Sequence, residues 1–227
     1  PMTTHTQFHL LKERRYLPFF LTQFFGAFND NVFKNALIIM IAFQVAEQHI
    51  NLLTNLAFGL FILPFFLFSA FAGQVADKYP KDTLIRRIKM GEIAIMLLAS
   101  VGFYLNHVGL LIFVLFLMGS QSSLFGPVKY GYLPEKLNRH ELMGGNGLVE
   151  SSTFISILLG TILGGILIAM DSFVPISLAV VGFATLGYLS ARQIPLTPAA
   201  EPTIKLDWGL WRATADNLKT VKRHRDI

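Results

Sequence analysis

Cysteine is absent from the 227 residues, and charged residues are scarce, at 15%. The absence of cysteine excludes a disulfide scaffold, a thiolate metal site and a cysteine nucleophile. A soluble domain carries about a quarter charged residues, so the low charge content excludes an ordinary cytosolic protein, and the composition also excludes a disordered or collagen-like chain. What is abundant is apolar: hydrophobic residues make up 53%, 21 residues are Phe, and the mean hydropathy is +0.52. This composition is typical of a membrane protein.

Long stretches without Asp, Glu, Lys or Arg locate the membrane-spanning segments. Residues 48–76 and 151–170 are free of charge, and each has the roughly 20 residues needed to cross a bilayer. Residues 93–128 are charge-free over a length that must fold back, and the turn is expected at 106–109. We therefore predict an all-α membrane protein. Its six transmembrane helices are expected at 17–45, 52–76, 90–106, 108–128, 147–170 and 173–191.

Basic residues gather on one side of these spans. All but one of the 19 Lys and Arg residues lie before the first span, between the second and third, between the fourth and fifth, or after the sixth. The positive-inside rule makes that side cytoplasmic, so both termini of this multi-pass protein are expected in the cytoplasm. The net charge of +5 then reflects topology and not a nucleic-acid partner. In this interpretation Lys89 belongs to the loop between the second and third spans.

Composition divides the chain into three parts. A short cytoplasmic segment (1–16) precedes the six-span transmembrane domain (17–191), and residues 192–227 follow it. The stretch 193–203 is rich in Pro and Ala and is expected to be a linker. After it, apolar residues that include both Trp recur at helical spacing beside basic residues. This pattern favours an amphipathic helix in the cytoplasmic interface, and the alternative is a soluble helix packed on a partner domain.

Two ionisable residues interrupt the first span, where such groups are costly and usually functional. Asp30 and Lys34 are four residues apart with the acid first, so they share one helix face in the favourable order. Gln23 and Ala27 continue this face into a polar stripe that is expected to line a water-filled cavity. We interpret it as a substrate or proton site, because Asn31 and its neighbours add polarity that neutralisation does not need. The alternative is a pair that neutralises itself and merely permits insertion.

Later spans carry three more notable charges. Lys129 ends the fourth span, and its ammonium either extends to the lipid headgroups or points inward to meet an anionic headgroup. Glu150, near the start of the fifth span, is expected to pair with Lys129 or with a basic loop residue, in a structural or a transport role. Glu92 is expected to form an interfacial pair with Arg87 or Lys89.

Enzyme chemistry has little support in the sequence. All six His residues fall outside the spans, and none shares metal-ligand spacing with another. We find no phosphate-binding glycine loop and no Ser-His-Asp set able to assemble in a membrane. We therefore expect no catalytic residues, no metal site and no cofactor.

The segment from Gly73 to Lys81, GQVADKYPK, resembles the loop signature of the major facilitator superfamily, G-x-x-x-D-[RK]-x-G-[RK]. It departs from that signature at Pro80, and its place after the second span on the cytoplasmic side fits the family. The resemblance implies that Asp77 stabilises an outward-facing state through contacts near the interface of two halves. On its own residues, Asp77 could simply cap and solvate a helix end. The conformational switch implied here comprises Gly73, Asp77, Lys78 and Lys81.

Three further segments narrow the resemblance. They are QFFGAFNDN at 23–31, GPVKYG at 126–131 and GNGLVESST at 145–153. Together they resemble bacterial lysophospholipid transporters of the LplT type, some of which are fused to acyltransferase domains. The resemblance implies a twelve-span transporter of two six-span halves, each a 3+3 inverted repeat. This chain is then the N-terminal half with part of the central linker.

The implied function is a flippase that moves lysophospholipids, such as lyso-phosphatidylethanolamine, from the outer to the inner leaflet of the bacterial inner membrane for re-acylation. Implied partners are the lysophospholipid, membrane lipids, a C-terminal six-span half and an acyltransferase domain. A lysolipid needs a polar lane beside an apolar wall, and Phe24, Phe28, Phe61, Phe65 and Phe66 are candidates for the wall. The substrate-binding candidates are Asp30, Asn31, Lys34, Gln121, Lys129 and Glu150.

Two other functions compete with this one. The first is a proton-coupled facilitator-type carrier of a drug or metabolite, with Asp30 as the proton site. The second is a non-transporting membrane module that anchors or regulates a partner enzyme. Substrate competition separates the first alternative from the lysolipid hypothesis, and an isolated unit that is stable, monomeric and inert favours the second.

Overall fold

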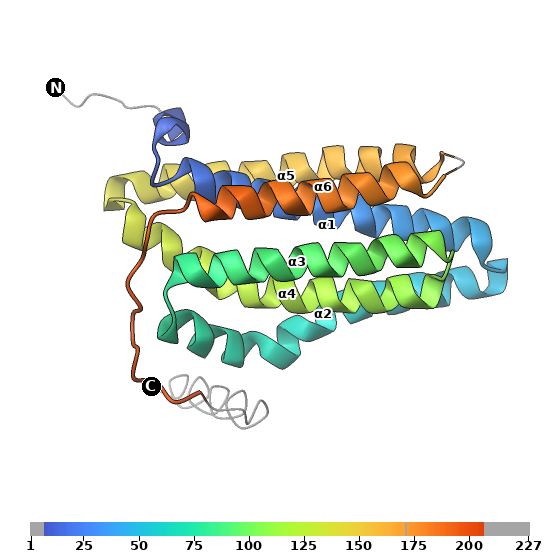
Figure 1. Cartoon of the computed structure of the whole chain (residues 1–227), viewed down its shortest axis with the longest axis horizontal. Helices are drawn as coiled ribbons and strands as arrows, with labels where there is room; N and C mark the ends of the chain where they lie inside the picture. Colours follow the sequence, from blue (N-terminus) through green and yellow to red (C-terminus); the bar gives the residue numbers. More distant parts are fainter. Residues whose placement is uncertain (1–6, 171, 207–227) are drawn as a thin grey trace, which may run out of the picture.

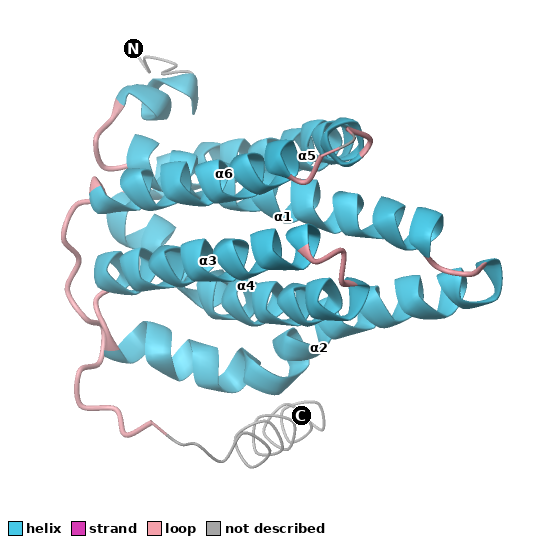
Figure 2. Cartoon of the chain, turned by 45° about the vertical axis from the view of Figure 1, so that its right-hand side comes forward, coloured by secondary structure: helices cyan, strands magenta, loops and turns pink. Residues whose placement is uncertain are grey.

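The computed structural model describes residues 7–170 and 172–206, and within these ranges every regular element is a helix. A short 3-10 helix precedes six long α-helices (Figure 1, Figure 2). The all-α prediction is confirmed. The elements are η1 (Gln7–Lys12), α1 (Leu17–Gln44), α2 (Glu47–Lys78), α3 (Lys81–Tyr104), α4 (Val108–Lys136), α5 (Arg139–Ile168) and α6 (Val174–Arg192).

The helices lie side by side along the long axis of the molecule and form two groups (Figure 1). In one group α1 packs against α5 and α6, and in the other α4 packs against α2 and α3. Contacts between α3 and α6 join the two groups, with a smaller contribution from α1 against α4. We call the end of the bundle where α1 begins and α6 ends the basic end, because the predicted basic loops lie there.

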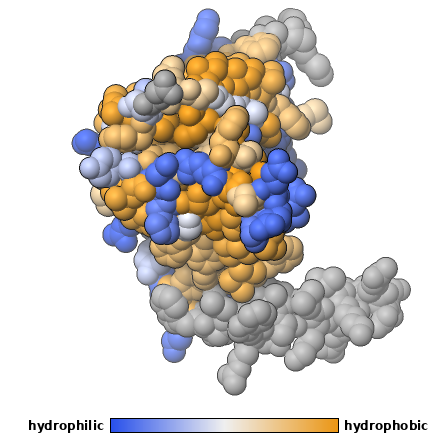
Figure 3. Space-filling view, turned by 90° about the vertical axis from the view of Figure 1, so that its right-hand side faces the viewer, coloured by the Kyte–Doolittle hydropathy of each residue, from blue (hydrophilic) through white to orange (hydrophobic). Residues whose placement is uncertain are grey.

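Four of the described helices, α2, α4, α5 and α6, are long and apolar enough to cross a membrane. Helices α1 and α3 are also long, at 28 and 24 residues, but polar and charged residues interrupt them. Large apolar side chains are exposed on the sides of the bundle, among them Phe66, Phe154 and Leu178. The end-on view of Figure 3 shows apolar residues over much of the periphery, as expected of a surface that meets lipid.

The helices extend beyond the predicted spans at the basic end. Helix α3 begins at Lys81 and not near residue 90, α4 continues to Lys136, and α5 begins at Arg139. Because of this extension, Lys89 lies inside α3 and is buried, so its assignment to a loop is wrong. At the opposite end the predicted turn is confirmed: α3 ends at Tyr104, and Asn106 takes the left-handed conformation with φ of 55°.

Polar contacts stabilise the helix ends at the basic end. Arg15 donates two hydrogen bonds to the Glu141 carboxylate, at 2.9 and 2.7 Å, and another to the carbonyl of Lys136 at 2.6 Å. The Glu141 carboxylate also accepts the backbone N–H of Asn138 and so caps α5. The Arg15 guanidinium, helped by the Asn138 N–H, lowers the pKa of Glu141 from 4.5 to about 2. The start of α1 is thereby fixed to the short turn between α4 and α5.

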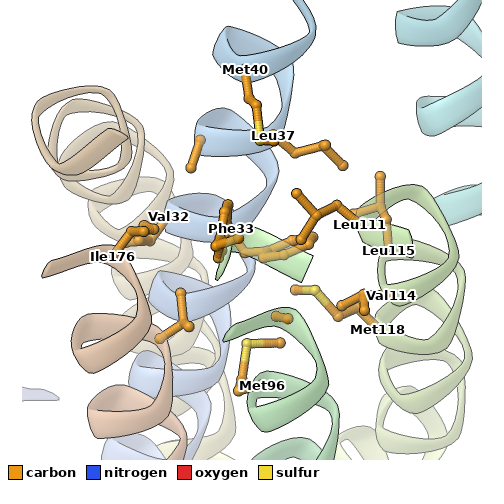
Figure 4. Close-up of a cluster of buried hydrophobic side chains, with 14 of the residues drawn as sticks. Val32, Phe33, Leu37, Met40, Met96, Leu111, Val114, Leu115, Met118 and Ile176 are labelled. Carbon is orange, nitrogen blue, oxygen red and sulfur yellow. The ribbon is translucent and has the colours of Figure 1, made fainter. Parts of the chain in front are cut away.

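Two apolar cores fill the bundle at different heights. The larger one joins α1, α3, α4 and α6, whose side chains converge in Figure 4. The second lies toward the basic end, around Phe19, Ile85 and Tyr132. Between them, along the helices, runs a set of buried polar side chains that we call the polar belt. The polar belt comprises Gln23, Lys89, Glu92 and Gln121.

Glycines bring α1 and α5 into close contact. A Cβ added at Gly164 falls 2.4 Å from the carbonyl oxygen of Val32, and one added at Gly160 falls 2.9 Å from the carbonyl oxygen of Phe28. Both neighbours are backbone atoms, so they cannot move aside cheaply. This is the close approach that small residues permit between membrane helices.

Residues 193–206, which we call the strap, run from the end of α6 across the basic end toward α2 (Figure 1). The buried Asp82 carboxylate accepts both the N–H and the hydroxyl of Thr197, at 3.0 and 2.9 Å. Arg86 donates to the carbonyl of Ile194, and the N–H of Glu201 donates to the carbonyl of Asp77. The strap is therefore a docked segment. Most of the predicted interfacial helix falls in 207–227, outside the described residues.

Candidate functional site

A pocket of about 310 Å³ opens beside the polar belt, and residues of α1 to α5 line it. Its polar side chains include Gln23, Asp30, Gln121 and Lys129, together with Ser122 of α4. Its apolar wall consists of Phe61 and Phe65 of α2 with Phe125 and Tyr130 of α4. The pocket thus combines one carboxylate, ammonium groups and an aromatic surface, so it offers both polar and apolar contacts to a ligand.

Asp30 and Lys34 do not form the ion pair expected from their spacing. Asp30 accepts a hydrogen bond from the Ser122 hydroxyl at 3.2 Å. The ammonium of Lys34 instead lies 5.4 Å from the centre of the Phe61 ring, in a cation–π contact. A shared face does not guarantee pairing, because each group here has a partner on a neighbouring helix. The direct contact that a self-neutralising pair would make is therefore absent between these two side chains.

Three of the six substrate-binding candidates line the pocket, namely Asp30, Gln121 and Lys129. Asn31 is buried against α5, where its amide donates to the carbonyl of Ala27 at 2.7 Å. Lys34 and Glu150 also lie outside the lining. The structure therefore brings together only part of the candidate set.

Lys129 points inward to meet a carboxylate and does not extend away from the bundle. Its ammonium lies 3.4 Å from Glu150 Oε1 and 5.0 Å from the centre of the Tyr130 ring. The Lys129 side chain is 12% exposed, whereas that of Glu150 is 51% exposed. The pair expected as one alternative for Glu150 is present, and it lies at the exposed edge of the site.

Two site residues were missed by the sequence reasoning. Lys89 lines the pocket, and its ammonium forms a buried ion pair at 2.7 Å with Glu92 one turn along α3. Glu92 also accepts hydrogen bonds from the amides of Gln121 and Asn29, each at 3.2 Å. The expected pairing of Glu92 with Lys89 is confirmed, but its interfacial placement is wrong. The i, i+3 spacing was visible in the sequence, yet the neighbouring Arg residues made it look like part of a loop.

Gly26 of α1 provides the space that Lys89 occupies. A Cβ at Gly26 falls 2.3 Å from the Lys89 ammonium nitrogen. On the other side, that nitrogen lies 5.1 Å from the centre of the Phe125 ring. Lys89 therefore reaches from α3 across α1 to the pocket because position 26 has no side chain.

The expected Phe wall is present in part. Phe61 and Phe65 line the pocket, whereas Phe24 and Phe28 stack on each other within the α1 packing, at 5.8 Å between ring centres. Phe66 is 73% exposed and faces away from the protein. Only the two α2 rings therefore serve the site as expected.

The predicted switch segment forms a sharp turn between α2 and α3. Only Tyr79 and Pro80 lie outside the two helices, and Pro80 directly precedes α3. Lys81 is buried and pairs with Glu135 of α4. Asp77 is exposed, and its backbone carbonyl holds the strap. The segment therefore links three helices and the strap at the basic end.

The sequence profile of the major facilitator superfamily matches residues 19–226. The chain belongs to the major facilitator superfamily. Membership in this family of multi-pass transporters confirms the expectation that the chain is not an enzyme. Among the described residues, no group of three His, Asp or Glu side chains is placed to hold a metal ion.

Curated relatives within this superfamily are similar to the chain over most of its length. The "Lysophospholipid transporter LplT" of Enterobacter sp. is 34% identical over 184 residues, that of Escherichia fergusonii 33% over 186, and that of Serratia proteamaculans 28% over 196. These matches cover 79, 80 and 86% of the chain but only 43, 43 and 46% of the relatives. The chain thus corresponds to the N-terminal portion of these facilitators, less than half of their length.

Proposed function

We propose that the chain is the N-terminal six-span half of a lysophospholipid transporter in the bacterial inner membrane. In this proposal α1 to α6 all cross the bilayer as a 3+3 inverted repeat, and both termini are cytoplasmic. The four apolar helices, the basic loops at one end and the similarity to LplT proteins support it. A C-terminal half packs against this one, and the exposed Asp77 at the end of α2 acts with Gly73, Lys78 and Lys81 as the conformational switch.

The observation that carries the substrate assignment is the content of the pocket. Asp30 offers a carboxylate to an ammonium group, Lys129 offers an ammonium to a phosphate, and Gln121 adds an amide. Phe61 and Phe65 offer an apolar surface beside them, suited to a single acyl chain. A lysophospholipid such as lyso-phosphatidylethanolamine carries all three complementary groups. The proposed direction is from the outer to the inner leaflet, where an acyltransferase re-acylates the product.

The test is translocation of lyso-phosphatidylethanolamine by the full-length protein in proteoliposomes. Asp30→Asn and Lys129→Ala are expected to lower uptake at least tenfold, because each removes one end of a charge-assisted contact with the headgroup. Glu47→Gln and Lys205→Ala are the matched controls, since both residues are exposed and outside the pocket. Both controls are expected to keep wild-type uptake.

Two results contradict the proposal. One is the absence of uptake by the wild type for every lysolipid headgroup, which moves the assignment to a carrier of another solute with Asp30 as its proton site. The other is wild-type uptake by both pocket variants, which removes the pocket from the pathway. Membrane insertion of each variant is checked by its yield in the detergent-solubilised monomer peak.

A further inference from the structure

Lys89 has more hydrogen-bonding capacity than its protein partners use. An ammonium group carries three N–H donors. Among the described residues only Glu92 accepts from Lys89, at 2.7 Å. Apart from Glu92, the ammonium lies over the face of the Phe125 ring and borders the pocket. A buried ammonium with two unused donors beside a pocket is suited to bind an anionic oxygen.

Glu92, in contrast, has a protein donor at each of its two carboxylate oxygens. It accepts one hydrogen bond from Lys89, one from Gln121 and one from Asn29, so three helices hold its two oxygens. Its side chain is 2% exposed. Glu92 therefore sets the direction of the Lys89 ammonium, and it does not itself line the pocket.

Two residues near Lys89, Gly26 and Lys129, shape the surroundings of its ammonium group. The missing side chain at Gly26 leaves the space that the Lys89 ammonium occupies. Lys129 lines the same pocket from α4, at the more exposed edge. Two ammonium groups therefore line one pocket, and ammonium groups make strong charge-assisted hydrogen bonds to phosphate oxygens.

We propose that Lys89 is a second phosphate-binding residue of the transporter and makes it selective for single-chain amphiphiles that carry a phosphate. Glu92 is the residue that positions it. This inference rests on the proposed function, because it assigns the deep half of the same pocket to the phosphate of the lysolipid. Asp30 is left to the amine end of the headgroup.

The decisive variant is the double substitution Lys89→Gln with Glu92→Gln in the full-length protein. It removes the ammonium without leaving a lone buried charge, and two amides can still hydrogen bond at this site. Binding of lyso-phosphatidylethanolamine and of a phosphate-free monoacylglycerol is measured in detergent, and lysolipid uptake is measured in proteoliposomes. Lys205→Gln is the matched control for loss of one lysine.

We expect the double variant to weaken lyso-phosphatidylethanolamine binding and raise the KM for uptake about tenfold or more. Its affinity for monoacylglycerol should stay within about twofold of wild type, because the aromatic wall is intact. If the ion pair serves folding only, the double variant binds both ligands as wild type does, and the inference is overturned.

The outcomes also separate this inference from the proposed function. If the wild type binds the lysolipid, loses this binding in the double variant, and yet does not move the lysolipid, the transport proposal is overturned. The assignment of Lys89 as a binding residue is then supported. If the wild type and the double variant move lysolipid with equal efficiency, the transport proposal stands and the role of Lys89 is overturned. Wild-type protein that neither binds nor moves a phosphate-bearing amphiphile overturns both.

Discussion

Two lysine–glutamate pairs lie at the same site, and they differ in almost every physical respect. Lys89 and Glu92 are 2.7 Å apart, and their side chains are 3 and 2% exposed. Lys129 and Glu150 are 3.4 Å apart, and half of the Glu150 side chain is exposed. The first pair is held by amides from two other helices, whereas the second has no further hydrogen bond among the described residues.

The comparison shows that the two pairs differ in how much stability is lost when they are broken and in how easily their lysine can bind a ligand. Removing one member of the deep pair leaves the other charge buried without a partner, so a single substitution there is expected to destabilise the bundle more than replacing both members together. The Glu150 carboxylate of the edge pair is half exposed, so breaking that pair returns this carboxylate to water at little cost. The edge pair can therefore exchange its partner for a ligand readily, whereas the deep pair can accept a ligand only through the unused donors of its lysine.

The largest effect is expected from Glu92→Leu. This change leaves the Lys89 ammonium buried without its partner, and the expected loss is about 3–5 kcal/mol of unfolding free energy. The readout is the thermal unfolding midpoint of the detergent-solubilised protein. Adding Lys89→Met to Glu92→Leu is the matched control and is expected to recover most of the loss. If Glu92→Leu alone loses less than about 1 kcal/mol of unfolding free energy relative to wild type, the distinction between the two pairs is removed.

The next effect concerns the space around Lys89. Gly26→Ala places a methyl group 2.3 Å from the lysine nitrogen, so the side chain must shift away from Glu92 or from the pocket. We expect a loss of about 1–3 kcal/mol, as in other overpacked interiors. Gly91→Ala is the control, because a Cβ at that helical position has no neighbour within 4 Å. Equal unfolding midpoints for the two alanine variants contradict a close fit at Gly26.

A smaller effect is expected at the basic end, where Arg15 and Glu141 form a partly buried pair with two hydrogen bonds. Arg15→Ala is expected to lower stability by about 1–2 kcal/mol. The pKa of Glu141 is about 2 in the folded protein and 4.5 ordinarily. Its contribution is therefore complete above pH 4.5 and is lost as pH falls toward 2. Unfolding midpoints from pH 6 to pH 3 should fall more steeply in wild type than in Glu141→Gln.

The smallest effect on stability is expected for Glu150→Gln. The pair with Lys129 lies at the exposed edge, so the change should alter the unfolding free energy by less than about 1 kcal/mol. Its unfolding midpoint is compared with that of Glu47→Gln, an exposed glutamate outside the site. A loss as large as that of Glu92→Leu contradicts the contrast between the deep pair and the edge pair.

The sequence was informative about helices and less so about which charges meet. Charge-free runs predicted the apolar spans and the turn at Asn106, because bilayer thickness fixes the length of such runs. Composition does not show how far a helix continues past its apolar run, because the polar residues there can find partners in the fold. Helix α3 therefore begins at Lys81, nine residues before the start predicted at residue 90. That extension carried Lys89 from an expected loop into the interior.

Spacing along one helix had the same limit at the site. Asp30 and Lys34 have the favourable i, i+4 order but do not pair, because Ser122 and Phe61 on other helices contact them. Lys89 and Glu92 have i, i+3 spacing and do pair. The deciding partners come from elements distant in sequence, and no local pattern identifies them.

The docked strap changes how far the following residues can reach. An extended chain covers at most about 3.3–3.6 Å per residue, and the first residues after α6 use this length to cross the basic end. Because Thr197 is held by Asp82 and Glu201 by Asp77, the described chain is anchored beside the end of α2 and not only at Arg192. Any tether length between this helical unit and a following domain should therefore be counted from residue 201.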